Sequence, residues 1–449
     1  MLTRRQALRS ASAGFGSLAF AGLAAEAAAR DAGPLAPKVP HFAPKAKRVI
    51  FLCMRGGPSH METFDPKPRL TADHGKPGRL PGCKLLGSRW GFKKHGQSGL
   101  DVVDLLPETA QHADKLCVLR GMHTDNENHP QALEQLHTGS FQFVRPSVGS
   151  WVLYGLGTEN RNLPGFVSIN PLTALGGTRY YQSAFLPAAY SATLLGDASR
   201  PTANPAVGNL SSPRLTPAGQ RAQLDLLGAM NRDLAARTAD PHVEGMIQSF
   251  ELAFRMQGEM PRVMDLSGET KETLALYGVG GPADTFGRQC LLARRLAEAG
   301  VRFVEVTHTE WDLHGSLTAG MVRNCGQIDR PVAGLLADLD RRGLLRDTLV
   351  VWGGEFGRTP EDPTQDGRGH NNKGFSLWLA GGGVKGGRTH GATDDHGYEA
   401  IQGRVHVHDL HATVLHLLGF DHQSFTYRYA GRDFRLTDVH GRVVSSLLA

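Results

Sequence analysis

The chain has 449 residues, of which 40% are hydrophobic and 20% are charged, and its formal net charge is +6. This length and composition support a large buried core and exclude a chain that is disordered throughout. The mildly basic charge is compatible with an anionic substrate, whereas the lack of a lysine and arginine run with interleaved aromatic residues excludes a typical nucleic-acid-binding surface.

The first 29 residues have the composition of an export signal. Arg4 and Arg5 form a twin-arginine pair within Thr3–Arg9, and a weakly hydrophobic stretch rich in alanine and glycine follows. We interpret residues 1–29 as a twin-arginine signal peptide; a general secretory signal or a poorly ordered tail is the alternative. No later run reaches the ~18 apolar residues that a membrane span needs. The sequence therefore predicts a periplasmic or extracellular protein, exported by the twin-arginine translocase and without a membrane span in its mature form.

The folded domain is predicted over residues 47–449, after a proline-rich linker at 30–46. Its first element is the continuous apolar run Arg48–Met54, which predicts a central strand buried on both faces. The pair Gly56-Gly57 follows and permits either a tight turn or a close backbone approach to a ligand. His60, in the same loop, is a candidate acid or base; a histidine that only stabilises the loop is an equally open interpretation.

Two further apolar runs, at 115–120 and 165–169, predict strands of the same sheet. The loop after the first of them contains His129, which is a second candidate acid or base. Between residues 186 and 281 the strand pattern gives way to helical stretches. We interpret this part as a helical insertion that packs over the sheet, either as a lid or as a scaffold.

The five cysteines include no pair with the CxxC spacing of many metal sites. Cys53, Cys117 and Cys290 lie in apolar segments, so we interpret them as thiols of the hydrophobic core. An oxidising compartment permits a disulfide, but the sequence selects no pair.

The most informative stretch runs from Val301 to Gly383. It predicts a strand at 301–306, a long helix at 316–342 and two more strands at 348–352 and 375–379. Polar residues follow the ends of these strands. In an open α/β sheet, ligands bind outside the carboxyl ends of the strands, so the pattern predicts an α/β fold with a site at that edge.

Three residues in this stretch have the side chains of a metal site. Asp312 and His314 lie in the loop after the first strand, and His370 lies in the loop before the last. Two histidines and one carboxylate suit Zn²⁺ with an open coordination position, whereas Mg²⁺ or Ca²⁺ would require more carboxylates. We expect His370 to lie within about 4–5 Å of both other residues, because Zn–N and Zn–O bonds are each about 2 Å long. The predicted cofactor is therefore a divalent metal ion, with zinc favoured.

Several longer motifs occur in order along the chain. They are Gly56-Gly57-Pro58-Ser59-His60 with Phe64–Pro68, Trp311–Gly315, Gly354–Pro360, Ala380–Gly387 and Asp409–Thr413. Together they resemble domain-of-unknown-function family 1501, a sulfatase-like branch of the alkaline phosphatase superfamily. The resemblance spans residues 48–449 and implies a three-layer α/β/α sandwich with a mostly parallel sheet, alkaline phosphatase-like, here with the helical insertion.

The resemblance also implies metal-binding roles. Asp312, His314 and His370 occupy places comparable to one metal site of the superfamily. Glu355 occupies the place of a ligand of the second metal, whose other ligands are missing from this chain. The resemblance therefore implies one complete metal site, with Glu355 as a further candidate ligand.

The resemblance implies a hydrolase of sulfate or phosphate esters that acts on an anionic ester or a sulfated polysaccharide. Arg358, with Arg55 as an additional candidate, would hold the anionic group, and His129 or His60 would act as acid or base. The place of the superfamily nucleophile falls at about Asn128-His129, where there is no serine, threonine or cysteine. Two other functions stay open for this reason: a non-catalytic exported protein that binds carbohydrate or protein, and an enzyme that transfers a phosphoryl or sulfuryl group.

Overall fold

The computed structural model describes residues 33–173, 176–200, 202, 204–208, 210, 214–238, 240–281 and 284–449. The predicted signal peptide at 1–29 lies outside these residues. Within them, no helix is both long enough and apolar enough to span a membrane.

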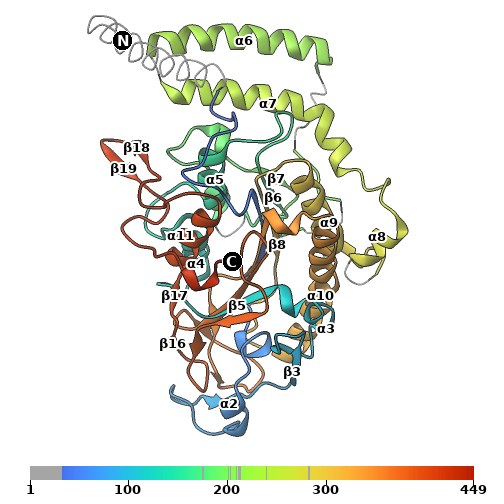
Figure 1. Ribbon diagram of the computed structural model, residues 1–449, viewed down its shortest axis with the longest axis vertical. Coiled ribbons are helices and arrows are strands. Elements are labelled where there is room, and N and C mark those ends of the chain that lie inside the picture. Colours follow the sequence, from blue (N-terminus) through green and yellow to red (C-terminus); the bar gives the residue numbers. More distant parts are fainter. Residues whose placement is uncertain are drawn as a thin grey trace, which may run out of the picture.

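A mixed sheet of nine strands lies at the centre of the described chain (Figure 1). Its order is β14-β5-β13-β9-β1-β8-β6-β7, and β17 also pairs with β5. The strands are β1 (Arg48–Met54), β5 (Leu116–His123), β6 (Phe166–Ile169), β7 (Thr193–Leu195), β8 (Phe303–His308), β9 (Thr348–Gly353), β13 (Phe375–Ala380), β14 (Arg388–His390) and β17 (Val405–His406). Each strand predicted from an apolar run is present.

The sheet is mostly parallel, as expected. β1 lies between β8 and β9, is parallel to both, and is buried along its whole length, which agrees with its continuous apolar sequence. β13 is the exception, because it runs antiparallel to both β5 and β9. The connection from β9 to β13 contains no helix in the described chain, and a parallel neighbour requires a long crossover, which is usually a helix.

Helices cover both faces of the sheet (Figure 1). On one face, α9 (Asp284–Glu298) packs on β1 and β8, and α10 (Leu317–Arg341) packs on α9. On the other face lie α4 (His129–Thr138), α5 (Val148–Leu156) and α11 (Val407–Leu417). The apolar stripe of α10 is buried: Ile328, Val332, Leu335 and Leu339. The fold is therefore the three-layer α/β/α arrangement.

The predicted insertion at 186–281 contains α6 (Pro217–Thr238), α7 (Pro241–Met264) and α8 (Lys271–Leu276). α6 and α7 lie side by side at the top of Figure 1, and α7 also packs on α9. The stretch includes β7 as well, which the sequence pattern missed because three residues are too few to show a period. Among the residues described, none from this insertion lines the cleft beside the site described below.

Short strand pairs shape the loops around the sheet. They are β2 (Lys84–Leu85) with β11 (Glu361–Asp362), β3 (Phe92–His95) with β4 (Leu100–Val103), β10 (Gly357–Arg358) with β12 (His370–Asn371), β15 (Ala392–Thr393) with β16 (Ala400–Gln402), and β18 (Tyr427–Tyr429) with β19 (Arg432–Phe434). Two short helices, α2 (Pro68–Ala72) and α3 (Pro107–Ala110), lie in the same loops. The β10–β12 pair positions the site, because it sets Arg358 directly opposite His370.

Candidate metal centre

Four polar side chains meet beyond the carboxyl ends of the central strands. Asp312 and His314 come from the loop after β8, and His370 comes from β12. His129 is the first residue of α4, which follows β5. Residues far apart in sequence thus lie at one edge of the sheet because their strands end there.

These side chains surround one carboxylate oxygen. Asp312 Oδ1 lies 3.1 Å from His129 Nε2, 3.1 Å from His314 Nε2 and 3.3 Å from His370 Nε2. His314 Nε2 and His370 Nε2 are 2.9 Å apart. The structure therefore brings Asp312, His314 and His370 within the distances expected from the sequence, and it adds His129 to them.

The hydrogen bonds on the far sides of two rings fix where their protons lie. His129 Nδ1 is 2.6 Å from Glu355 Oε1, and His370 Nδ1 is 2.7 Å from the carbonyl oxygen of Glu127. Both partners are acceptors, so each Nδ1 carries the proton and each neutral ring directs an Nε2 lone pair at Asp312. His129 Nε2 is buried and has no hydrogen-bond partner among the described residues. Imidazole lone pairs that converge on one carboxylate oxygen form a ligand set for a metal ion, and His129, Asp312 and His370 fit Zn²⁺.

The central carboxylate is held in its charged form. Burial opposes ionisation of Asp312, but its contacts with two imidazoles and with Arg358 outweigh burial and hold the pKa of this carboxyl well below its usual range. Burial lowers the pKa of His129, yet the adjacent carboxylates of Asp312 and Glu355 leave that pKa raised overall. The pKa of His314 is lowered, chiefly by burial. An ionised oxygen among imidazoles favours a cation at this point.

Arg358 braces the site from inside. Its side chain is only 1% exposed, and each of its three guanidinium nitrogens donates to a protein oxygen. One bond, of 2.6 Å, reaches Asp312 Oδ1, and others reach the carbonyls of Gly56, Gly57, Arg368 and Trp311. The prediction that Arg358 holds a bound anion therefore does not fit, because the guanidinium faces the protein and orients Asp312 instead.

Glu355 and His60 also differ from their predicted roles. Glu355 is fully buried, and its oxygens accept from Gly56 N at 3.0 and 3.2 Å and from His129 Nδ1. It therefore supports a ligand ring and does not itself face the centre. His60 is buried outside the cluster, where its Nε2 is 3.0 Å from the carbonyl oxygen of Gly397 and burial lowers its pKa to about 4. A loop-stabilising His60, the alternative interpretation, agrees with these contacts.

A cleft of about 710 Å³ opens beside the cluster. His314 and His370 line it, together with the basic residues Arg79 and Lys373. The side chains of Asp312 and His314 are 38% and 54% exposed, so both can be reached from solvent. The cleft is therefore the route by which a ligand can reach the cluster.

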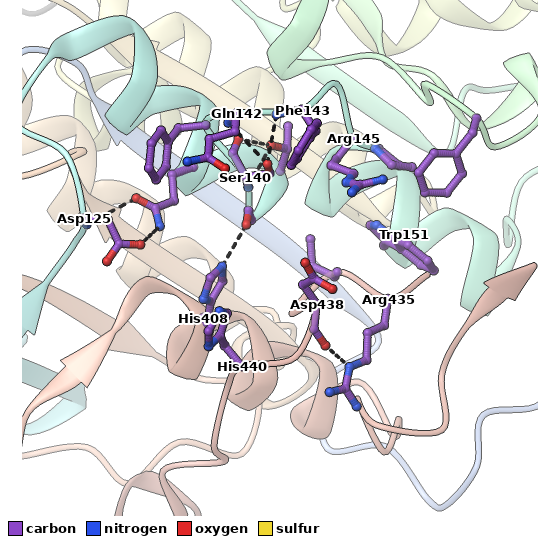
Figure 2. A pocket seen from close by; sticks show the side chains of 17 residues that line it. Asp125, Ser140, Gln142, Phe143, Arg145, Trp151, His408, Arg435, Asp438 and His440 are labelled. Carbon is purple, nitrogen blue, oxygen red and sulfur yellow. Dashed lines mark hydrogen bonds between the residues drawn. The ribbon is translucent and has the colours of Figure 1, made fainter. Parts of the chain in front are cut away.

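A second pocket, of about 260 Å³, lies near the end of α4 (Figure 2). Figure 2 shows Asp125 at one side of it and Trp151 and Arg435 at the other. None of the four clustered residues lines this pocket. The two hollows are separate, and the cleft alone adjoins the candidate metal centre.

Comparisons with known proteins give one family and several distant folds. The family described as "Protein of unknown function (DUF1501)" matches residues 46–448. No curated protein matches the chain in sequence. Solved structures that resemble it include Ps i-CgsB (11% identity, TM-score 0.38, 84% of this chain and 72% of that chain). A second is the sulfatase PsFucS1 from Pseudoalteromonas sp. (12% identity, TM-score 0.36, 84% of this chain and 68% of that chain). A third is alkaline phosphatase from the Antarctic bacterium TAB5 (10% identity, TM-score 0.31, 83% of this chain and 97% of that chain).

Proposed function

This chain belongs to the DUF1501 family, and from that premise and the geometry of the cluster we propose that it is an exported, metal-dependent hydrolase of sulfate or phosphate esters. The observation that carries the proposal is the convergence of three imidazole Nε2 atoms on Asp312 Oδ1. The residues that would hold the metal ion are His129, Asp312, His314 and His370. A divalent ion bound there, with zinc favoured by these ligands, supplies Lewis-acid charge beside the ester.

The side chains of the chain itself prepare the site. Glu355 keeps a proton on His129 Nδ1, and the Glu127 carbonyl keeps one on His370 Nδ1, so both rings stay oriented. Arg358 keeps Asp312 charged and in place. These contacts preorganise the site before a substrate arrives, which is what electrostatic catalysis requires.

Other cations than Arg358 are available to bind the anionic group. Arg55 follows β1, and its Nε is buried without a hydrogen-bond partner among the described residues. Arg79 and Lys373 line the cleft. We therefore assign Arg79 and Lys373 to negative charges of the substrate, as on a sulfated polysaccharide, and keep Arg55 as a further candidate.

The hydroxyl of Ser59, the nearest alternative nucleophile in the first loop, is not placed to attack the ester. Ser59 is buried, and its hydroxyl donates to Glu62. His129 is the first residue of α4, close to the place, about Asn128-His129, where the family resemblance implies a nucleophile. Water is therefore the proposed nucleophile, and hydrolysis proceeds without a covalent intermediate on the protein.

The test is turnover of aryl sulfate and aryl phosphate by zinc-loaded protein. Asp312→Asn removes the central charge and should abolish turnover. His390→Ala is the control, because His390 lies on β14 and contacts Ser446 rather than the cluster, and it should leave turnover unchanged. Zinc-loaded wild-type protein that hydrolyses neither ester, or an Asp312→Asn variant as active as wild type, would overturn the proposal.

A second candidate is a non-catalytic binding protein on the same fold. The lack of a hydroxyl or thiol at Asn128-His129 is the observation that favours it. Binding of a sulfated polysaccharide to zinc-loaded protein, without release of sulfate, would support this candidate.

Adding an alcohol to the assay tests group transfer, because a transferase would move the sulfuryl or phosphoryl group to the alcohol.

A further inference from the structure

A second group of metal-binding side chains lies inside the molecule. Cys53 on β1, His137 on α4 and Glu305 on β8 each place a ligand atom within 4.8 Å of the other two. All three are buried, with exposed fractions of 1%, 2% and 0%. This inner cluster lies between the sheet and α4, apart from the residues of the outer cluster at the strand ends.

The inner cluster contains more hydrogen-bond acceptors than hydrogen-bond donors. His137 Nδ1 is 2.7 Å from the carbonyl oxygen of Leu133, so Nδ1 carries the proton of the neutral ring. Its Nε2 lone pair then faces Glu305 Oε1 at 3.2 Å, where two acceptors meet. Thr307 donates to Oε1 at 3.3 Å, but Glu305 Oε2 has no partner among the described residues. A buried carboxylate in this state is costly unless a cation compensates it.

We infer that Cys53, His137 and Glu305 hold a second divalent ion, of the zinc class, with a structural role. One sulfur, one nitrogen and one oxygen ligand suit Zn²⁺ rather than Mg²⁺ or Ca²⁺. Thiolate and carboxylate together carry two negative charges, which a divalent ion neutralises. The alternative to a metal ion is a protonated His137 that pairs with Glu305. That alternative leaves Glu305 Oε2 without a partner and gives the Cys53 thiol no role.

The surroundings agree with a closed, structural site. The rings of Tyr180 and Tyr181 lie against His137, with centroids 5.3 and 5.9 Å from it. Because all three ligands are closed off from solvent, the ion would enter as the chain folds.

The inner ion would also steady the outer cluster. His137 and His129 both belong to α4, and a separation of eight positions corresponds to about 12 Å along the helix. An ion that ties His137 to β1 and β8 fixes α4 against the sheet. His129, at the start of the same helix, is thereby held at the outer cluster.

Cobalt replaces zinc and reports on sulfur ligands. The full chain, produced in cobalt-supplemented medium, should contain two ions and show a thiolate-to-cobalt charge-transfer band. The outer cluster contains no sulfur, so the band would come from Cys53. Dialysis against a chelator should remove the outer ion and leave the inner ion until the chain is unfolded.

Matched cysteine variants complete the test. Cys53→Ser should lose the band and one ion, whereas Cys117→Ser, at a buried cysteine of β5 outside both clusters, should keep both. His137→Gln, checked for folding by circular dichroism, is the second variant should Cys53→Ser not fold, and it should lose the inner ion. The inference is overturned by folded wild-type protein without a thiolate band and with at most one ion. A band that persists in folded Cys53→Ser overturns it as well.

Discussion

Glu355→Gln tests whether the carboxylate behind His129 controls metal binding. Glu355 Oε1 accepts from His129 Nδ1 at 2.6 Å and from Gly56 N at 3.0 Å, while Oε2 lies 3.2 Å from Gly56 N. Glutamine has the same shape, but one end of its amide is a donor. In one orientation the NH₂ group faces Gly56 N–H, and in the other it faces His129 Nδ1–H. Either way two donors meet, and the charge that polarises the His129 ring is lost.

The size of the effect follows from these contacts. Loss of an outer partner of a metal-binding histidine typically lowers metal affinity roughly 10–100-fold. That range corresponds to about 1.4–2.7 kcal/mol. The buried donor pair should also lower the unfolding free energy of the metal-free protein by about 1–3 kcal/mol. Competition with a chromophoric chelator measures the zinc affinity, and urea unfolding measures the stability.

Glu127→Gln is the matched control for charge. The Glu127 side chain is exposed beside the cleft, and only its backbone carbonyl contacts His370, so the variant removes a charge without releasing a ligand ring. Zinc affinity should then stay within about threefold of wild type, because exposed charges interact weakly. Equal losses in both variants, or none in Glu355→Gln, would refute the role assigned to Glu355.

Three further predictions concern folding and export. Arg358→Ala should lower the unfolding free energy by about 1–3 kcal/mol in urea, because it leaves buried carbonyl groups without their donor; a folded, equally stable variant would contradict the bracing role. Burial lowers the pKa of His60 to about 4 and that of His411 to about 3, from 6.5. Below pH 6.5 the unfolded chain therefore binds more protons than the folded chain. The unfolding free energy should fall between pH 6.5 and pH 4, by up to about 1.4 kcal/mol per pH unit for each of the two histidines. Urea unfolding that is unchanged between pH 7 and pH 5 would contradict this prediction. Replacing Arg4 and Arg5 with lysine should leave the protein in the cytoplasm, and cell fractionation that finds normal export would exclude the twin-arginine route.

Much of the fold could be predicted because hydrophobic pattern and burial are directly linked. The run at 48–54 is apolar throughout and forms the strand buried on both faces, and the stripe along 316–342 forms the buried face of α10. The direction of β13 is not written in its side chains. The direction follows from the connection after β9, which contains no helix in the described chain, whereas a parallel neighbour usually requires a helical crossover. The lack of a helical pattern in this loop could have been read from the sequence.

The candidate site was predictable in part. Asp312, His314 and His370 stand at strand ends, where the topology of the sheet brings loops together. The role of His129 depends on Glu355, which is 226 residues away and fixes the ring by one hydrogen bond. Sequence also reveals the charge of Arg358 but not the direction of its guanidinium, which only the folded carbonyls around it determine.

The glycine pair after β1 explains how the loop that carries Asp312 and the side chain of Arg358 fit together. The sequence left two interpretations open, a tight turn or a close approach to a ligand. A Cβ on Gly56 would lie 2.5 Å from Asp312 N, and its φ of +114° is one that other residues rarely adopt. The close approach is therefore to the loop that carries Asp312, not to a ligand. Because Arg358 donates to the carbonyls of Gly56 and Gly57 and also to Asp312, the same small turn sets the position of the carboxylate on which the histidines converge.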